Sequence, residues 1–291
     1  MGALTVIDID LEALRSTFGF GVAGNFTGHL EQAGEAGDFH NVAAAAAQPK
    51  GIFPWYVPGS EAFLGTWPLD AARLLVPDPD AAPGRIQIEP ELGLYCEVER
   101  AEDGSVRTLR PRWAAAFDDC SLRRPNAPKI SHKKNWGAGS KGLARRAFAV
   151  SDVASDGALE SLRLACFLRR GSETHAYGVD SALVSYMLTG ERLLDWLVER
   201  LHHQHGSDDT PLEDVGALLT ESGATSVLVG VGASRYEPLG ESTFVQPGDE
   251  AIVVVYDAEA HEPDQVTERI AARADEKLGA ASILRRVAVT A

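Results

Sequence analysis

Apolar residues recur at every second position in several segments of this chain. Ile86, Ile88, Leu92 and Leu94 follow this period, which is typical of a β-strand with one buried face. We therefore expect residues 85–99 to form a strand pair or one long bent strand. Further strands are expected at 3–9 (or the start of a helix there), at two stretches within 105–123, and at 147–153, 161–169, 226–231, 251–256 and 283–290.

Helical spacing of apolar residues is found in fewer places. It is longest over residues 181–201, where the intervals are three and four. Shorter helices are expected at 29–33, 211–223 and 263–279, whereas the run 43–47 is too short to form a helix alone. Seven prolines between Pro49 and Pro83 predict extended, turn-rich structure. Because strands outnumber helices and do not alternate regularly with them, the pattern favours an α+β fold over a doubly wound sheet.

Residues 19–24 (GFGVAG) match the glycine pattern of dinucleotide-binding loops. That fingerprint requires a strand that runs directly into the first glycine and a helix that begins within the motif. Here residues 15–18 (RSTF) precede the motif, and Asn25, Gly28 and Gly34 interrupt the sequence that follows. We interpret the segment as a glycine-rich turn.

The chain has 291 residues, 45% of them hydrophobic, and a net charge of −15 from 27 Lys and Arg against 42 Asp and Glu. This composition is typical of a folded protein with one large or two smaller domains, and it excludes a disordered chain. The acidic excess disfavours nucleic acid as a partner. The three cysteines lack metal-pair spacing, and neither a basic leader nor a membrane-spanning apolar run is found. A cytoplasmic protein without membrane contact is expected.

The spacing of Glu89 and Glu91 is the most informative among the carboxylates. In a strand, residues i and i+2 lie on one face, so both side chains would project together. Like charges this close repel unless water, a shared proton or a cation separates them, and a hard divalent cation is one solution. Pro90 cannot donate to a strand ladder, which indicates an edge or a bulge. An exposed acidic strand face is the alternative to a metal site.

Two further positions carry candidate chemistry. Asp118 and Asp119 follow the apolar run 113–117 (WAAAF), and Asp119 could be a third metal ligand or part of a helix cap or turn. His29 lies near Glu31 and Glu35 in the sequence, and a carboxylate could orient it as a general base.

Basic residues gather in the glycine-rich segment 125–142, which is expected to be a loop. This segment reverses the sign of the chain's charge locally, so it could bind an anionic substrate or be an ordinary solvated loop. His202, His203 and His205 end the longest expected helix. We interpret them as compensating the helix dipole rather than as metal ligands.

Taken in order, these pieces resemble the fumarylacetoacetate hydrolase superfamily. The family's Gly-x-Asn…His segment, Pro-rich lead-in, Glu-x-Glu-Leu strand, Asp-x-Ser-x-Arg motif, Lys loop, Gly-x-Gly segment and Pro-Gly-Asp turn all have counterparts. They are residues 24–29 (GNFTGH), 52–58 (IFPWYVP), 89–93 (EPELG), 118–123 (DDCSLR), 141–142 (KG), 230–232 (GVG) and 245–249 (VQPGD). The order of these motifs, rather than any single one, is what resembles the family.

The resemblance implies an α+β fold, a mixed β-roll with a few flanking helices, usually as a homodimer. It implies a bound Mg²⁺, with Mn²⁺ or Ca²⁺ as alternatives, and Glu89, Glu91 and Asp119 correspond to the family's metal carboxylates. The expected organisation is an N-terminal segment over 1–17, a catalytic domain over 18–256 and a C-terminal helical extension over 257–291.

The resemblance also implies site roles and a substrate. Lys141 corresponds to the family's active-site lysine and His29 to its catalytic histidine, which Glu31 or Glu35 would assist. The expected substrate is a small anionic 2-oxo or 1,3-dicarbonyl acid. Its expected contacts are Arg123, Ser121 and Lys134.

Some residues depart from the family pattern. Gln32 stands where C–C hydrolases of the family often place the glutamate of a His–Glu dyad, and Val57, Arg124 and Val231 replace other motif residues. The family's metal-binding residues therefore have clearer counterparts in this sequence than its catalytic residues do. We expect a C–C hydrolase that acts through a metal-stabilised enolate. A decarboxylase, isomerase or hydratase, and a catalytically inert relative that binds a small acid or a partner protein, are the alternatives.

Overall fold

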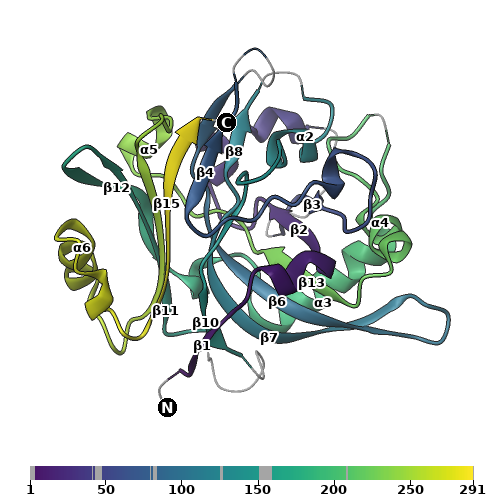
Figure 1. Cartoon of the computed structure of the whole chain (residues 1–291). Coiled ribbons are helices and arrows are strands. Elements are labelled where there is room, and N and C mark those ends of the chain that lie inside the picture. Colours follow the sequence, from purple (N-terminus) through teal and green to yellow (C-terminus); the bar gives the residue numbers. More distant parts are fainter. Residues whose placement is uncertain are drawn as a thin grey trace.

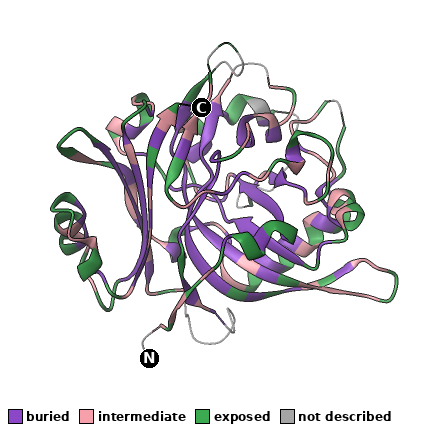
Figure 2. Ribbon diagram, viewed as in Figure 1, coloured by how far each residue is buried: buried purple, intermediate pink, exposed green. Residues whose placement is uncertain are grey.

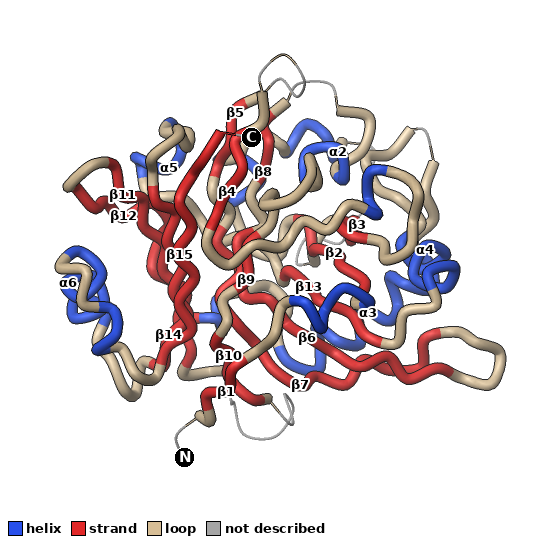
Figure 3. The backbone as a smooth tube through the Cα atoms, viewed as in Figure 1, coloured by secondary structure: helices blue, strands red, loops and turns tan. Residues whose placement is uncertain are grey.

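The computed structural model describes residues 4–40, 42, 48–78, 80, 84–124, 127–150, 159–207 and 209–290. Two β-sheets pack against each other in these residues, and the helices lie around them (Figures 1 and 3). The expected α+β fold with mixed sheets is confirmed. The run 43–47 lies outside the described residues.

The larger sheet has eight strands in the described residues. In spatial order they are β1 (Val6–Asp8), β10 (Arg146–Ala149), β7 (Val106–Asp118), β6 (Pro90–Arg100), β13 (Ser226–Gly230), β2 (Phe18–Ala23) and β3 (Gly51–Tyr56), with β9 (Gly142–Leu143) also paired to β7. The β13–β2 pair is parallel and the other pairs are antiparallel. The hairpin of β6 and β7 therefore lies between β10 and β13, which come from later parts of the sequence.

The smaller sheet has five strands in the described residues. Their order is β12 (Glu173–Ala182), β11 (Leu162–Arg170), β14 (Glu250–Asp257), β15 (Ala281–Thr290) and β4 (Arg73–Val76), and the β15–β4 pair is parallel. A separate ribbon joins β5 (Arg85–Gln87) to β8 (Ser121–Arg123). The segment expected as a helical extension thus contributes β15, an interior strand of the five-stranded sheet.

The helices are short and peripheral. They are α1 (His29–Gln32), α2 (Ser131–Lys134), α3 (Gly190–His203), α4 (Val215–Ser222), α5 (Pro238–Ser242) and α6 (Pro263–Ala271), together with 3₁₀ turns at Glu12–Ser16, Ala36–Phe39, Phe63–Gly65, Leu183–Ser185 and Asp275–Lys277. Helices α3 and α4 lie beside the larger sheet, and α6 covers the outer face of the smaller one (Figure 1). None of the described helices combines the length and apolar character that crossing a membrane requires.

The core lies between the two sheets, and Figure 2 shows their strands as mostly buried. Leu92 and Leu94 of β6 contribute to it from the larger sheet, and Val253 and Val255 of β14 from the smaller one. Side chains alternate between the two faces of a strand. Glu91 directly precedes Leu92 in β6, so its side chain points to the opposite face of the larger sheet.

Three local predictions are corrected by the structure. Residues 19–24 are not a turn, because residues 18–23 form the buried strand β2. The helix expected over 181–201 begins only at Gly190, since 173–182 form β12 and 183–185 form a 3₁₀ turn. Residues 106–118 form one continuous strand rather than two.

Close packing explains why β2 is rich in glycine. A Cβ atom added at Gly19 would lie 2.4 Å from the ring of Trp55, and one at Gly21 would lie 2.5 Å from the ring of Phe53. Both rings belong to β3, the neighbouring strand. The glycines therefore make room for aromatic rings within a sheet, and they do not mark a turn.

Candidate metal centre

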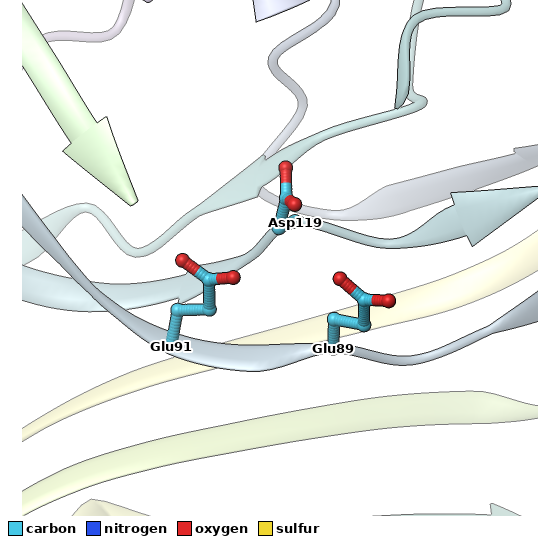
Figure 4. A group of neighbouring side chains, drawn as sticks. All are labelled: Glu89, Glu91 and Asp119. Carbon is cyan, nitrogen blue, oxygen red and sulfur yellow. The ribbon is translucent and has the colours of Figure 1, made fainter. Parts of the chain in front are cut away.

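The hairpin of β6 and β7 brings the three candidate carboxylates together. Pro90 pairs with Asp118, and the Asp119 N–H donates to the Glu89 carbonyl at 3.0 Å, so the two strand ends lie side by side. Pro90 is the first residue of β6, a position where a missing N–H is tolerated. Oxygen atoms of Glu89, Glu91 and Asp119 lie within 4.8 Å of one another (Figure 4). These side chains are buried, with exposed fractions of 3%, 2% and 0%.

Asp118 holds the two ends in register. Its Oδ1 accepts hydrogen bonds from the backbone N–H groups of Glu89 (3.1 Å) and Cys120 (3.0 Å). Its Oδ2 accepts from Arg286 Nη1 at 2.9 Å. Cys120 has a φ of 22°, an unusual value for a residue with a side chain, which turns the chain sharply after Asp119. Asp118 is therefore a supporting residue, and Asp119 is the one that faces the cluster.

Basic side chains contact two of the three carboxylates. The Lys134 ammonium contacts both Glu89 and Asp119. Arg123 Nη2 donates to Glu89 Oε1 at 2.6 Å. Lys141 donates to the main-chain oxygens of Asp119 and Cys120 and lies 3.5 Å from the Asp119 carboxylate. Burial opposes ionisation of Glu89, but Lys134 and Arg123 outweigh it and hold the pKa of Glu89 well below its usual range.

Glu91 has different surroundings. Its Oε2 accepts the backbone N–H of Gly232 at 3.0 Å. Burial and the nearby Asp119 raise the pKa of Glu91 well above its usual range. A Cβ at Gly230 would lie 2.4 Å from Glu91 Oε2, so the Gly-x-Gly segment leaves the room that this carboxylate occupies.

His29 is the first residue of α1 and faces the carboxylates. Its Nδ1 lies 2.8 Å from the Ser234 carbonyl, which can only accept, so this nitrogen carries the hydrogen. Its Nε2 points towards Glu89, 3.9 Å from Oε1. Burial lowers the pKa of His29, which favours the neutral ring. A neutral ring with Nδ1–H leaves Nε2 able to accept a proton in the site.

The expected carboxylate partner of His29 is replaced by the Ser234 carbonyl. Glu31 is exposed and does not line the site. Glu35 is buried, but its carboxylate contacts Arg123 at 2.7 Å and Lys133 at 3.3 Å. Gln32 exchanges hydrogen bonds with the backbone of Tyr236 instead. The structure therefore brings Glu35 into the site as an anchor for basic side chains and leaves Glu31 outside it.

Of the candidate substrate-binding residues, two contact the carboxylate cluster and one does not. Arg123 and Lys134 contact Glu89, as described above. Ser121 is completely buried in β8, opposite Gln87 in β5, and does not line the cavity at the site. Ser121 is thus a buried residue at the end of this ribbon, away from the cavity.

A small cavity adjoins the cluster. Its volume is about 20 Å³, and its lining includes His29, Glu35, Glu91, Asp119 and Lys134. That volume holds about one water molecule or one ion. A larger cavity of about 140 Å³ is lined mainly by aliphatic residues, among them Leu92 and Leu94, on the other face of β6. The charged groups therefore converge on a space of the size of a metal ion, and a substrate would require further opening.

The three carboxylates fit a divalent cation. They offer hard oxygen ligands from two adjacent strand ends. Their oxygen atoms lie within 4.8 Å of one another, close enough to contact one ion. The raised pKa of Glu91 reflects a buried carboxylate that lacks sufficient positive charge nearby, which a cation would supply. Mg²⁺, Mn²⁺ and Ca²⁺ share this preference for oxygen.

A model of a protein family matches residues 35–287, which include Glu89, Glu91 and Asp119 but not His29. Its description is "Family of unknown function (DUF5718)". The chain belongs to DUF5718. No curated protein sequence matches this DUF5718 protein significantly.

Solved structures share the fold of this DUF5718 protein at low sequence identity. Cg1458, in a crystal structure with an inhibitor, is 14% identical, with a TM-score of 0.54 and coverage of 94% of this chain and 77% of that one. A 5-carboxymethyl-2-hydroxymuconate delta-isomerase from Mycobacterium smegmatis is 13% identical, with a TM-score of 0.50 and coverage of 94% and 79%. A putative HpcE protein from Mycobacterium smegmatis is 16% identical, with a TM-score of 0.50 and coverage of 94% and 75%. The fumarylacetoacetate hydrolase fold expected from the sequence is thereby confirmed.

Sequence reasoning missed several residues that shape this DUF5718 site. Arg286 anchors Asp118 from β15, and the Ser234 carbonyl orients His29 from the segment after β13. A backbone carbonyl has no sequence signature, and Arg286 lies 168 residues from its partner. The signal available for Gly230 was its place in the Gly-x-Gly motif, which resembled the family's pattern.

Proposed function

We propose that this protein is a divalent-metal-dependent enzyme that acts on a small 2-oxo or 1,3-dicarbonyl acid. The observation that carries the proposal is the convergence of three buried carboxylates beside a histidine whose Nε2 is free to accept a proton. Mg²⁺ is the proposed metal, with Mn²⁺ or Ca²⁺ as alternatives. A homodimer and a cytoplasmic location belong to the same proposal.

Glu89, Glu91 and Asp119 would hold the cation. A bound divalent cation would chelate an oxo-carboxylate and act as a Lewis acid on its carbonyl oxygen. Arg123 and Lys141 place positive charge beside the carboxylates, where they would attract an anionic substrate and stabilise negative charge that develops on it.

His29 would transfer the proton. In the proposed C–C hydrolysis, Nε2 takes a proton from a water molecule whose oxygen bonds to the second carbonyl carbon. The bond between that carbon and the oxo-acid fragment then breaks, and its electron pair remains on the fragment. His29 returns the proton to the fragment's carbon, so one water is consumed, the attacked carbonyl leaves as a carboxylic acid, and the oxo-acid fragment is released. The Ser234 carbonyl keeps the ring in the required tautomer.

An isomerase, decarboxylase or hydratase is the second candidate. It is favoured by the contact of Glu35 with Arg123 and Lys133, since His29 then lacks the carboxylate partner that would strengthen it as a base towards water. Proton transfer on a carbon acid needs only the free Nε2. A delta-isomerase among the proteins of the same fold is consistent with this alternative.

Calorimetric titration with Mn²⁺, followed by oxalate, tests the proposal. We expect the wild-type protein to bind Mn²⁺ and then to bind oxalate only with the metal present, because oxalate mimics an oxo-acid. Glu91→Ala should lose Mn²⁺ binding, since it removes one of the three carboxylates. Glu97→Ala is the matched control, because Glu97 lies on the same strand, is 48% exposed and pairs with Arg112.

Two outcomes would contradict parts of the proposal. Wild-type-like Mn²⁺ affinity in Glu91→Ala would show that the metal binds elsewhere. Metal-dependent oxalate binding without turnover of any oxo-acid or dicarbonyl acid would favour the inert relative.

A further inference from the structure

The Lys134 side chain lies where a metal ion would have to bind. Its ammonium contacts Glu89 Oε2 and Asp119 Oδ2 together. A cation that bridges these two carboxylates needs the same oxygen atoms. Lys134 is buried, and its ammonium lies against these two carboxylates.

Acidic and basic side chains are equal in number at and next to the carboxylate cluster, among the residues that the structure describes. The acidic side chains are Glu35, Glu89, Glu91 and Asp119, and the basic ones are Arg123, Lys133, Lys134 and Lys141. A divalent cation would add two positive charges to this set. Unbalanced charge is costly in a buried site, so cation binding is favoured if a basic group withdraws or an anion enters with the metal.

Lys134 is the basic group best placed to withdraw. It belongs to α2, a helix of four residues (Ser131–Lys134), and its ammonium is joined to the backbone by four rotatable bonds. Arg123 has a planar group that contacts Glu89 and Glu35 at once and also donates to Gln87, so its withdrawal would break several contacts together. Lys141 is held by two backbone carbonyls as well as by Asp119.

We infer that Lys134 is an internal counter-ion that competes with the divalent cation for Glu89 and Asp119. This inference rests on the proposed function and adds a regulatory step to it. The Lys134 ammonium would leave the two carboxylates when a cation binds, and it would remain beside the site. There it supplies positive charge for an anionic substrate, so metal and substrate bind in that order.

The test compares Mn²⁺ binding by calorimetry in the wild-type protein and in Lys134→Met. Methionine keeps much of the side-chain length without the charge. Mn²⁺ affinity should rise by about tenfold or more in Lys134→Met, because the competing ammonium is gone. Lys133→Met is the matched control, since Lys133 is adjacent in sequence and contacts Glu35, which is not among the three proposed ligands. Its change in affinity should be clearly smaller.

Thermal unfolding gives a second readout that does not depend on activity. Removing Lys134 takes one of the positive partners from the buried carboxylates of Glu89 and Asp119. Lys134→Met should therefore unfold at a lower temperature than the wild type, and its unfolding temperature should rise more than that of the wild type on addition of Mn²⁺. Lys134→Gln replaces it if the methionine variant does not fold.

The outcomes separate the inference from the proposed function. Equal or weaker Mn²⁺ binding in Lys134→Met, while the wild type binds Mn²⁺, overturns the inference and leaves the proposed function standing. Tight binding by Lys134→Met alone supports the inference and overturns metal-dependent activity of the wild type. No binding by either protein overturns both.

Discussion

Glu89 and Glu91 are two residues apart, yet the pKa of one is lowered and that of the other is raised. Both side chains are buried, so burial alone cannot distinguish them. Basic groups contact Glu89 directly, whereas Glu91 accepts the Gly232 N–H and lies near Asp119. The local arrangement of charge therefore decides the ionisation of each carboxylate.

Glu213 is a carboxylate outside the site with perturbed ionisation. Burial raises the pKa of Glu213 from 4.5 to about 7, and the charge of Lys129 offsets part of this effect. The Lys129 ammonium itself donates to backbone carbonyls, including those of Thr210 (2.7 Å) and Leu212 (3.1 Å). A group whose pKa is raised in the folded state stabilises the fold when protonated. That stability is lost as the pH rises from 4.5 through about 7.

Glu213→Gln should abolish the loss of folding stability that accompanies ionisation of Glu213 at rising pH. The variant should match the wild type closely at pH 5 and exceed its free energy of unfolding at pH 8 by up to roughly 3 kcal/mol, from the size of the pKa shift. Urea denaturation at the two pH values measures the difference. Glu31→Gln, at an exposed position, should show no such change. A stability gap for Glu213→Gln that does not grow with pH would refute the assignment.

At the scale of elements, the glycines of residues 19–24 illustrate how the same residue type can indicate a turn or lie in a buried strand. In β2 the glycines lie in an interior strand of the sheet, where aromatic rings of β3 cover them. In isolation the same residues favour turns, which is why the sequence predicted a turn there. The partner strand that resolves this ambiguity begins only at Gly51.

Gly19→Ala should destabilise the protein by about 1–3 kcal/mol, because its methyl group would overlap the Trp55 ring in a close-packed sheet. Chemical denaturation measures this loss. Gly279→Ala is the control, since no heavy atom lies within 4 Å of an added Cβ there. Equal stability of the two variants would contradict the packing explanation.

At the scale of the molecule, Arg286 and Asp118 join the two sheets. Arg286 belongs to β15 of the smaller sheet and Asp118 to β7 of the larger one, and both are fully buried. Asp118 also holds the backbone of Glu89, so the pair connects the packing of the sheets to the geometry of the carboxylates.

Arg286→Met should cost about 3–5 kcal/mol of stability, because it leaves the Asp118 charge buried without its partner. The double variant Asp118→Asn/Arg286→Met removes both charges but keeps a side-chain oxygen for the backbone N–H groups of Glu89 and Cys120, so it should recover a substantial part of this loss. Thermal or urea unfolding of the single and double variants measures the coupling between the residues. Additive losses would contradict a direct interaction.

The sequence predicted what local patterns encode. Strand periodicity indicated several strands of both sheets, among them β6, β11 and β14. The spacing of Glu89, Glu91 and Asp119 indicated the cluster that the structure brings together. The partner of Arg286, the carbonyl that orients His29 and the position of Lys134 depend on segments that meet only after folding. Strand β12 and the late start of α3 were missed because the apolar spacing of 181–201 continues through a strand end and a 3₁₀ turn.

Anomalous diffraction from crystals grown with Mn²⁺ tests the central claim most directly. We expect one strong peak in contact with the carboxylates of Glu89, Glu91 and Asp119, with the Lys134 ammonium displaced from Glu89 and Asp119. No peak between these carboxylates, at Mn²⁺ concentrations that saturate binding in solution, would contradict the assignment of the metal centre.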